Sequence, residues 1–163
     1  MPLTIQQDNA YFQIDDPLKG TALWTAVHSA TKENGTMRFI PRVFREQFPP
    51  EHDLFSNHHI RCYPDESKEV LVELPAGGIL FFAYGTPHAT GANNTDSERA
   101  GIAHHFINAD QNGTALAGFE VGKRPFLTGA DASGGEREYG VRLAGRWETE
   151  IERVDRVGRG LTL

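Results

Sequence analysis

Gln6, Asp8 and His88 carry side-chain atoms that could bind a divalent metal ion. A non-haem iron site commonly uses two histidines and one carboxylate on one face of the metal, which leaves the opposite face open. Side chains at positions i and i+2 of a strand project to the same side, so Gln6 and Asp8 would share a face if "IQQDNAYF" is a strand. His88 would then supply the third ligand.

Arg99 stands eleven residues after His88, at the head of the run "RAGIAHHFIN". A guanidinium at this position could bind a carboxylate through two parallel hydrogen bonds. Taken one at a time, these residues have simpler explanations: Asp8 as a solvated carboxylate, His88 as a loop residue and Arg99 as a surface charge. The His88-to-Arg99 spacing among short strands favours the paired interpretation.

His58, His59 and Cys62 form a second group of possible metal ligands. A structural zinc site would need another Cys or His pair at finger spacing, and the sequence has none. We therefore interpret these three as loop residues.

Period-two alternation of apolar and polar residues predicts the elements that would position these side chains. An Asn-Gly pair at 34–35 suits a tight turn, and the proline-containing stretch 42–65 is typical of a long loop with one helical turn at most. The predicted strands cover 10–14, 21–30, 36–40, 69–74, 79–84 and 99–108.

Near the end of the chain, Leu143, Trp147, Ile151 and Val154 recur at helical spacing and predict one amphipathic helix within 140–158. Short strands with Gly- and Pro-rich turns predict a mainly β fold, a cupin-like jelly roll or double-stranded β-helix that carries this C-terminal helix. We expect one domain over residues 1–163.

The composition of the chain limits the kinds of binding partner that we expect. Sixteen basic and twenty-two acidic residues give a net charge of −6 without a basic cluster, which argues against nucleic acid as a partner. Cys62 is the only cysteine, so no intramolecular disulfide can form and a cytoplasmic location is expected. The longest apolar run, residues 79–84, is far below the roughly 20 residues that a membrane span needs, so no membrane partner is expected.

Three stretches resemble the phytanoyl-CoA dioxygenase family of iron(II)- and 2-oxoglutarate-dependent oxygenases: "QQDNAYF", "ALWTAVHSATKENGTMRFIP" and "GGILFFAYGTPHATGANNTDSERAGIAHHFINAD". The resemblance covers residues 5–110 and is weak from Gln111 onward. It implies that Asp8 and His88 are metal ligands and that Arg99 binds the distal carboxylate of 2-oxoglutarate. It also places Trp24 and Thr90 among the other co-substrate contacts.

The chain departs from the family pattern in two ways. The family opens its ligand pair as His-x-Asp, whereas this chain has Gln6 in place of the first histidine. The family also carries a long segment before this motif, so the chain looks truncated at its front. An exposed sheet would then favour self-association, most simply as a homo-oligomer.

A glutamine amide oxygen keeps the formal charge of the site but favours harder ions than iron, so Gln6 as a metal ligand would weaken iron binding. Either His104 or His105 could fill the vacant position, since one of two neighbouring strand residues must face inward. Two functions follow. The first is an oxygenase that hydroxylates a small organic substrate with Fe(II), or another divalent metal, and 2-oxoglutarate. The second is a vestigial module that binds metal or 2-oxoglutarate without turnover.

Overall fold

The computed structural model describes residues 4–52, 59–108 and 111. The chain divides into two compact units, Met1–Val121 and Gly122–Leu163, and every described residue lies in the first. The amphipathic helix predicted within 140–158 therefore lies outside the described residues, and a single domain over the whole chain stays a prediction.

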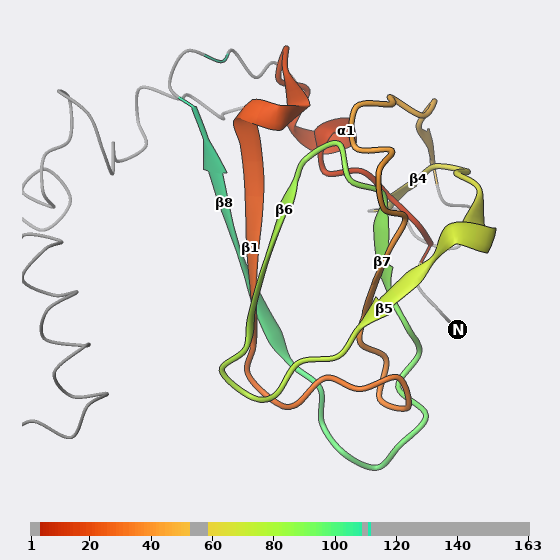
Figure 1. The fold of residues 1–163 in the computed structure, drawn as a ribbon, viewed down its shortest axis with the longest axis vertical. Helices are drawn as coiled ribbons and strands as arrows, with labels where there is room; N and C mark the ends of the chain where they lie inside the picture. Colours follow the sequence, from red (N-terminus) through yellow and green to blue (C-terminus); the bar gives the residue numbers. More distant parts are fainter. Residues whose placement is uncertain (1–3, 53–58, 109–110, 112–163) are drawn as a thin grey trace, which may run out of the picture. The chain divides into compact units, whose positions relative to one another are not determined.

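Two three-stranded antiparallel sheets form the described unit. In the first, β1 (Gly20–Ala26) lies between β6 (Ile79–Ala83) and β8 (Gly101–Ile107). In the second, β2 (Met37–Phe39) lies between β5 (Val70–Val72) and β7 (His88–Thr90). Figure 1 shows β8, β1 and β6 side by side, with β5 and β7 across from them. This mainly β arrangement agrees with the predicted jelly roll.

Apolar side chains from both sheets fill the space between them. Along β1, Ala22, Trp24 and Ala26 are buried and alternate with half-buried residues, which confirms the alternation in the sequence. Trp24 and Ala26 pack in one cluster with Met37 and Phe39 of the second sheet. The two sheets are therefore two layers over one core.

Glycine is required where the Trp24 indole crosses β8. A Cβ atom on Gly101 would lie 2.3 Å from the Trp24 ring. Gly35 has a φ of 87°, in the left-handed region that glycine adopts readily, and ends the turn predicted at 34–35. The side chain of Asn34 closes this turn, because its Oδ1 accepts from the Thr31 N–H at 2.7 Å.

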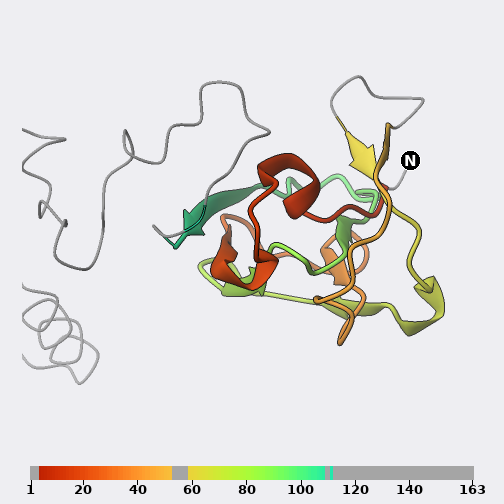
Figure 2. The same ribbon diagram turned by 90° about the horizontal axis from the view of Figure 1, so that it is seen from above.

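The strand predicted over 10–14 is wrong. Residues Asn9–Phe12 form a short helix, α1, which ends at Gln13 in the left-handed conformation (φ 45°). The Asn9 side chain accepts from the Ile14 N–H and donates to the Ile14 carbonyl. These local bonds take backbone groups that a strand would give to its ladder. Figures 1 and 2 place α1 at the end of the sheets where β1 begins.

The other differences concern short elements. Strand β1 stops at Ala26, and Ala30 makes only an isolated bridge with Leu74, so the strand predicted over 21–30 is too long. The predicted loop 42–65 contains a two-stranded sheet, β3 (Glu51–His52) with β4 (Ile60–Arg61). Single turns of 3-10 helix, η1 and η2, cover Pro17–Lys19 and Glu66–Lys68.

The outer face of the first sheet carries exposed apolar side chains. Ile79 and Phe81 of β6 are 52% and 63% exposed, and Ile102 of β8 is 51% exposed. Such a face is compatible with self-association, which stays a prediction. Among the described residues, none of the helices is long and apolar enough to cross a bilayer.

Candidate metal and co-substrate site

A pair of reciprocal hydrogen bonds connects Gln6, near the start of the chain, to His88 of β7. The Gln6 N–H donates to the His88 carbonyl, and the His88 N–H donates to the Gln6 carbonyl, both at 2.9 Å. Residues that exchange both bonds in this way project their side chains to the same face. His88 therefore reaches the site from a strand rather than from the loop after 79–84.

Asp8 lies beside His88 although it does not continue a strand. It stands at the start of α1 in helical conformation (φ −59°, ψ −32°), so the i, i+2 argument for a face shared with Gln6 is wrong. The turn of the chain nevertheless brings its Oδ1 to 3.5 Å from the His88 Nε2. The predicted carboxylate–imidazole pair is therefore formed by different local geometry.

The pair is buried, and the backbone engages the second nitrogen of the imidazole. Asp8 and His88 are 5% and 6% exposed. The His88 Nδ1 lies 2.9 Å from the Thr86 carbonyl oxygen, which can only accept, so Nδ1 carries the proton. In the neutral ring, Nε2 then presents a lone pair to the Asp8 carboxylate, and a cation between them would satisfy both.

A divalent metal fits this donor set. Two donor atoms 3.5 Å apart can both lie about 2.0–2.2 Å from one ion, the distances usual for imidazole nitrogen and carboxylate oxygen. The second carboxylate oxygen, Asp8 Oδ2, is buried and has no hydrogen-bond partner among the described residues. Asp8 thus keeps acceptor capacity that the fold leaves unused.

A third ligand of the usual type is missing from this part of the chain. Among the described residues, no three His, Cys, Asp or Glu side chains are grouped closely enough to hold one metal ion. His105 lines the same cavity as Asp8 and His88, as expected for the inward member of the His104–His105 pair, but it does not complete a ligand triad.

A cavity of about 200 Å³ surrounds the pair. Of the predicted site residues, Gln6, Asp8, Trp24, His88 and Thr90 all line it. The remaining wall comes from both sheets, from Thr4 and from His59, a residue that the sequence placed in a loop without a role. These other lining residues are Thr4, Ala22, Met37, His59, Phe82, Ala89, Ala103 and His105.

Arg99 is not among the residues that line this cavity, but it has unused binding capacity. Its Nε is buried without a hydrogen-bond partner among the described residues, and the same holds for the Thr90 Oγ1. Buried polar groups are normally paired, so the two are candidates for contact with a polar ligand. Arg99 lies two residues before the start of β8, whereas Thr90 ends β7.

Aromatic and imidazole groups shape the electrostatics around Asp8. Burial lowers the pKa of His105, and the negative charge of Asp8 opposes that shift. Burial raises the pKa of Tyr84, and the Asp8 charge raises it further. Tyr84 stacks on Phe12 with 4.5 Å between ring centroids. The Tyr84 phenol and the His105 imidazole are therefore favoured in their neutral forms.

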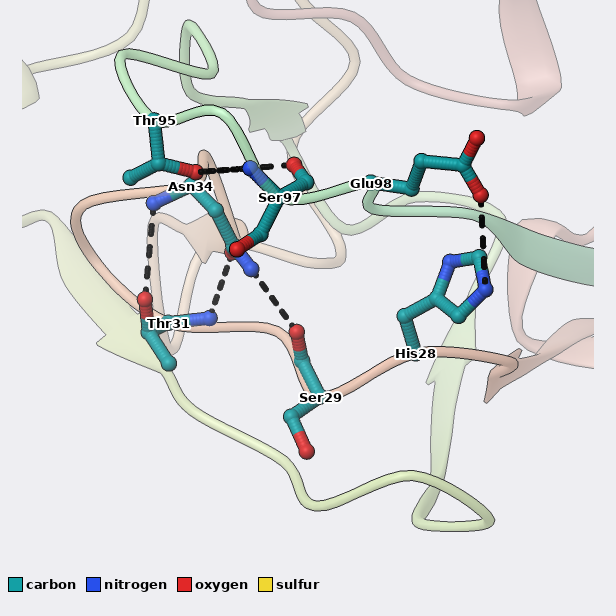
Figure 3. Close-up of a pocket in the computed structure, with 7 residues that line it drawn as sticks. All are labelled: His28, Ser29, Thr31, Asn34, Thr95, Ser97 and Glu98. Atoms are coloured by element: carbon teal, nitrogen blue, oxygen red, sulfur yellow. Dashed lines mark hydrogen bonds and ion pairs between the residues drawn. The ribbon is translucent and has the colours of Figure 1, made fainter.

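A second, more open pocket of about 600 Å³ lies at the turn that follows β1 (Figure 3). Its polar atoms are largely bonded to one another. Asn34 bonds to the backbone of Thr31 and Ser29, and the His28 Nε2 lies 3.8 Å from the Glu98 carboxylate. The His28–Glu98 pair is largely exposed, so this pocket offers less buried chemistry than the one around Asp8.

A double-layered jelly roll with a buried carboxylate–imidazole pair beside a cavity is compatible with the fold of a metal-dependent oxygenase. The family model described as phytanoyl-CoA dioxygenase (PhyH) matches residues 2–101. The chain belongs to the phytanoyl-CoA dioxygenase family, which confirms the resemblance found in the sequence.

Individual relatives agree with this assignment. The chain is 27% identical over 113 residues to a probable phytanoyl-CoA dioxygenase of Caenorhabditis elegans, with 65% of this chain and 36% of the relative covered. Two solved structures are each 27% identical over 71% of the chain. EvdO2 from Micromonospora carbonacea var. aurantiaca, complexed with 2-oxoglutarate, has a TM-score of 0.59 over 48% of its length. The apo non-heme monooxygenase ThoJ has a TM-score of 0.60 over 43% of its length.

The chain thus spans about a third of the length of that curated relative and less than half of either solved structure.

Proposed function

We propose that this chain binds a divalent metal ion and 2-oxoglutarate, and acts as an iron(II)- and 2-oxoglutarate-dependent oxygenase on a small organic substrate. The buried Asp8–His88 pair carries the proposal, because its two facing acceptors are 3.5 Å apart and Asp8 Oδ2 has no partner in the described part of the chain. Family membership and the 2-oxoglutarate complex of EvdO2 support the choice of cofactors.

In this proposal Asp8 Oδ1 and His88 Nε2 hold the metal. Thr86 keeps the imidazole in the tautomer that can bind, because its carbonyl oxygen accepts a hydrogen bond from the protonated Nδ1. When bound, the metal would supply the chemistry that couples oxidation of 2-oxoglutarate by dioxygen to oxidation of the substrate. The protein's task is to fix the ligands and to exclude water.

Aromatic rings protect the imidazole on its apolar side. The Phe82 ring centroid lies 4.6 Å from that of His88, and the Phe39 centroid lies 6.0 Å away. These rings fix the orientation of His88 and keep water from its face. An apolar surface of this kind lowers the local dielectric constant and so strengthens the interaction between the Asp8 carboxylate and a cation.

Arg99 and Thr90 are the proposed partners of the 2-oxoglutarate carboxylates. Each has a buried polar atom with no partner among the described residues, and a carboxylate can accept from both. Trp24 forms part of the same cavity wall. Its large flat ring would limit the space open to the co-substrate.

A binding module without turnover is the second candidate. It is favoured by Gln6, which occupies the place of the family's first histidine and lines the cavity beside Asp8 and His88. Such a module would bind metal and 2-oxoglutarate but would not consume the co-substrate.

Anaerobic titration with Fe(II), followed by 2-oxoglutarate, tests the binding that both candidates share. We expect one metal per chain, lost in Asp8→Ala and retained in Glu98→Ala, a matched change in the turn pocket. Retention of metal by Asp8→Ala would contradict both candidates. Succinate formation on admission of oxygen would then identify an oxygenase, and its absence from a loaded protein would identify a binding module.

A further inference from the structure

The side-chain amide of Gln6 is already engaged on one side. The Tyr11 hydroxyl lies 2.9 Å from Gln6 Oε1, and the Ile60 N–H donates to the Tyr11 oxygen at 2.7 Å. The phenol oxygen accepts from the Ile60 N–H, and the phenol O–H donates to Gln6 Oε1. A short relay therefore runs from the backbone of β4 through Tyr11 to Gln6.

This relay determines which atom of the amide remains available. The oxygen and the NH₂ group of a primary amide are bonded to the same carbon and point in different directions within one plane. The oxygen of Gln6 faces Tyr11, whereas no described residue accepts a hydrogen bond from its Nε2. Gln6 also lines the cavity beside Asp8 and His88, and its bridge to His88 puts both side chains on one face.

We propose that Tyr11 is a positioning residue that turns the Gln6 amide so that its NH₂ group, a hydrogen-bond donor, faces the cavity. An NH₂ group cannot bind a cation, so Gln6 is not a metal ligand in this arrangement. It donates instead to an oxygen of the 2-oxo acid bound at the Asp8–His88 ion. The inference rests on the proposed metal and 2-oxoglutarate site and assigns the role of its third position.

The opposite arrangement predicts different effects of mutation. If Gln6 bound the metal through its oxygen, the Tyr11 hydrogen bond would hold that ligand in place, and removing the hydroxyl would weaken metal binding. If Tyr11 holds the oxygen away from the metal, removing the hydroxyl frees the amide to rotate and offers the ion another ligand. Tyr11→Phe thus changes metal affinity in opposite directions in the two cases.

The experiment measures Mn(II) affinity by titration, and then 2-oxoglutarate affinity at saturating Mn(II), so that no turnover is needed. For Gln6→Leu we expect a Mn(II) Kd within about twofold of the unchanged protein, and a 2-oxoglutarate Kd raised about tenfold or more by the loss of one hydrogen bond to a charged group. For Tyr11→Phe we expect tighter Mn(II) binding. Tyr63→Phe, which removes an exposed hydroxyl that bonds to Glu51, is the matched control and should change neither constant.

A double variant separates positioning from a general structural effect. If Tyr11 acts through Gln6, the combination of Tyr11→Phe with Gln6→Leu should bind Mn(II) no more tightly than Gln6→Leu alone. Weaker Mn(II) binding by Tyr11→Phe, a tenfold loss in Gln6→Leu, or a gain that persists in the double variant would overturn the inference. Failure of the unchanged protein to bind Mn(II) at all would overturn the proposed function together with it.

Discussion

Two pockets of the described unit differ in how many of their polar atoms have hydrogen-bond partners. The larger pocket, about 600 Å³ at the turn after β1, has polar groups that bond to one another and to the backbone. The smaller cavity, about 200 Å³ around Asp8 and His88, retains buried polar atoms without partners in the described residues. Unused buried hydrogen-bonding capacity, rather than volume, is therefore the feature that favours the smaller cavity as the candidate binding site.

The side-chain amides of Asn34 and Gln6 differ in the same way, in how many of their polar atoms have hydrogen-bond partners. Asn34 uses its oxygen for the Thr31 N–H and its NH₂ for the Ser29 carbonyl, so both ends of the amide stabilise the turn. Gln6 uses its oxygen for Tyr11 and keeps its NH₂ free of any described partner. Asn34 therefore has a structural role, whereas the Gln6 amide can still donate a hydrogen bond to a ligand.

Removing the Asp8 carboxylate from the smaller cavity is the most direct test of whether the two pockets have different roles in metal binding. Asp8→Ala deletes one of two proposed metal ligands, so metal affinity should fall by more than the roughly 10–100-fold typical of an outer-shell partner. Calorimetric titration with Mn(II) measures the loss. Glu98→Ala, in the turn pocket, should leave affinity unchanged, and an equal loss in that variant would mean that the two pockets had been assigned the wrong roles.

Arg99→Ala tests the proposed carboxylate contact and should have the next largest effect. A hydrogen bond to a charged group contributes about 1.5–3 kcal/mol, so the 2-oxoglutarate Kd should rise about 10–150-fold while the metal Kd stays the same. Arg45→Ala, which removes an exposed guanidinium near Phe44, is the control. Loss of metal binding in Arg99→Ala would argue against a role confined to the co-substrate.

Asn34→Ala should act on stability alone. The variant leaves the partly buried Thr31 N–H and Ser29 carbonyl without side-chain partners, so the free energy of unfolding should fall by about 1–3 kcal/mol. Urea denaturation measures this change, and metal affinity should not move. Asn93→Ala, in an exposed turn, should cost less than about 0.5 kcal/mol. Weaker metal binding in Asn34→Ala would connect the two pockets.

Sequence patterns predicted those parts of the molecule that depend on local periodicity. The alternation around Trp24 matches the buried and half-buried positions of β1, and the pairing of Asp8 with His88 followed from the family resemblance. Strand β7 is only three residues long, too short to show a period of two. Helix α1 was missed because the Asn9 side chain replaces a strand's backbone partners at Ile14.

The relay to Gln6 could not be read from the sequence for a different reason. Tyr11 and Ile60 are 49 positions apart, and their hydrogen bond joins the start of the chain to β4 within the stretch predicted as a loop. No local pattern encodes such a contact. The same holds for His59, which reaches the cavity from that stretch.

The smallest effect is expected at Cys62, because the reactivity of its thiol reports on the stability of the segment that carries Gln6. The Cys62 N–H donates to the Ile5 carbonyl at 2.8 Å, and both side chains pack in one buried cluster. Burial raises the pKa of the Cys62 thiol from its ordinary 9.0 to about 11, so the folded state favours the neutral thiol. This contribution to stability is complete below pH 9 and is lost as the pH rises towards 11.

Alkylation with iodoacetamide at pH 8 should therefore be slow in the folded protein and fast in urea, because reaction needs the thiolate and an opening of this cluster. If the smaller cavity is the binding site, saturating Mn(II) should slow the alkylation further by holding Asp8 and His88 together and so restraining the segment next to Ile5. In Asp8→Ala the added metal should have no effect, whereas in Glu98→Ala the protection should persist. Protection that survives in Asp8→Ala would place the metal elsewhere and remove the distinction between the two pockets.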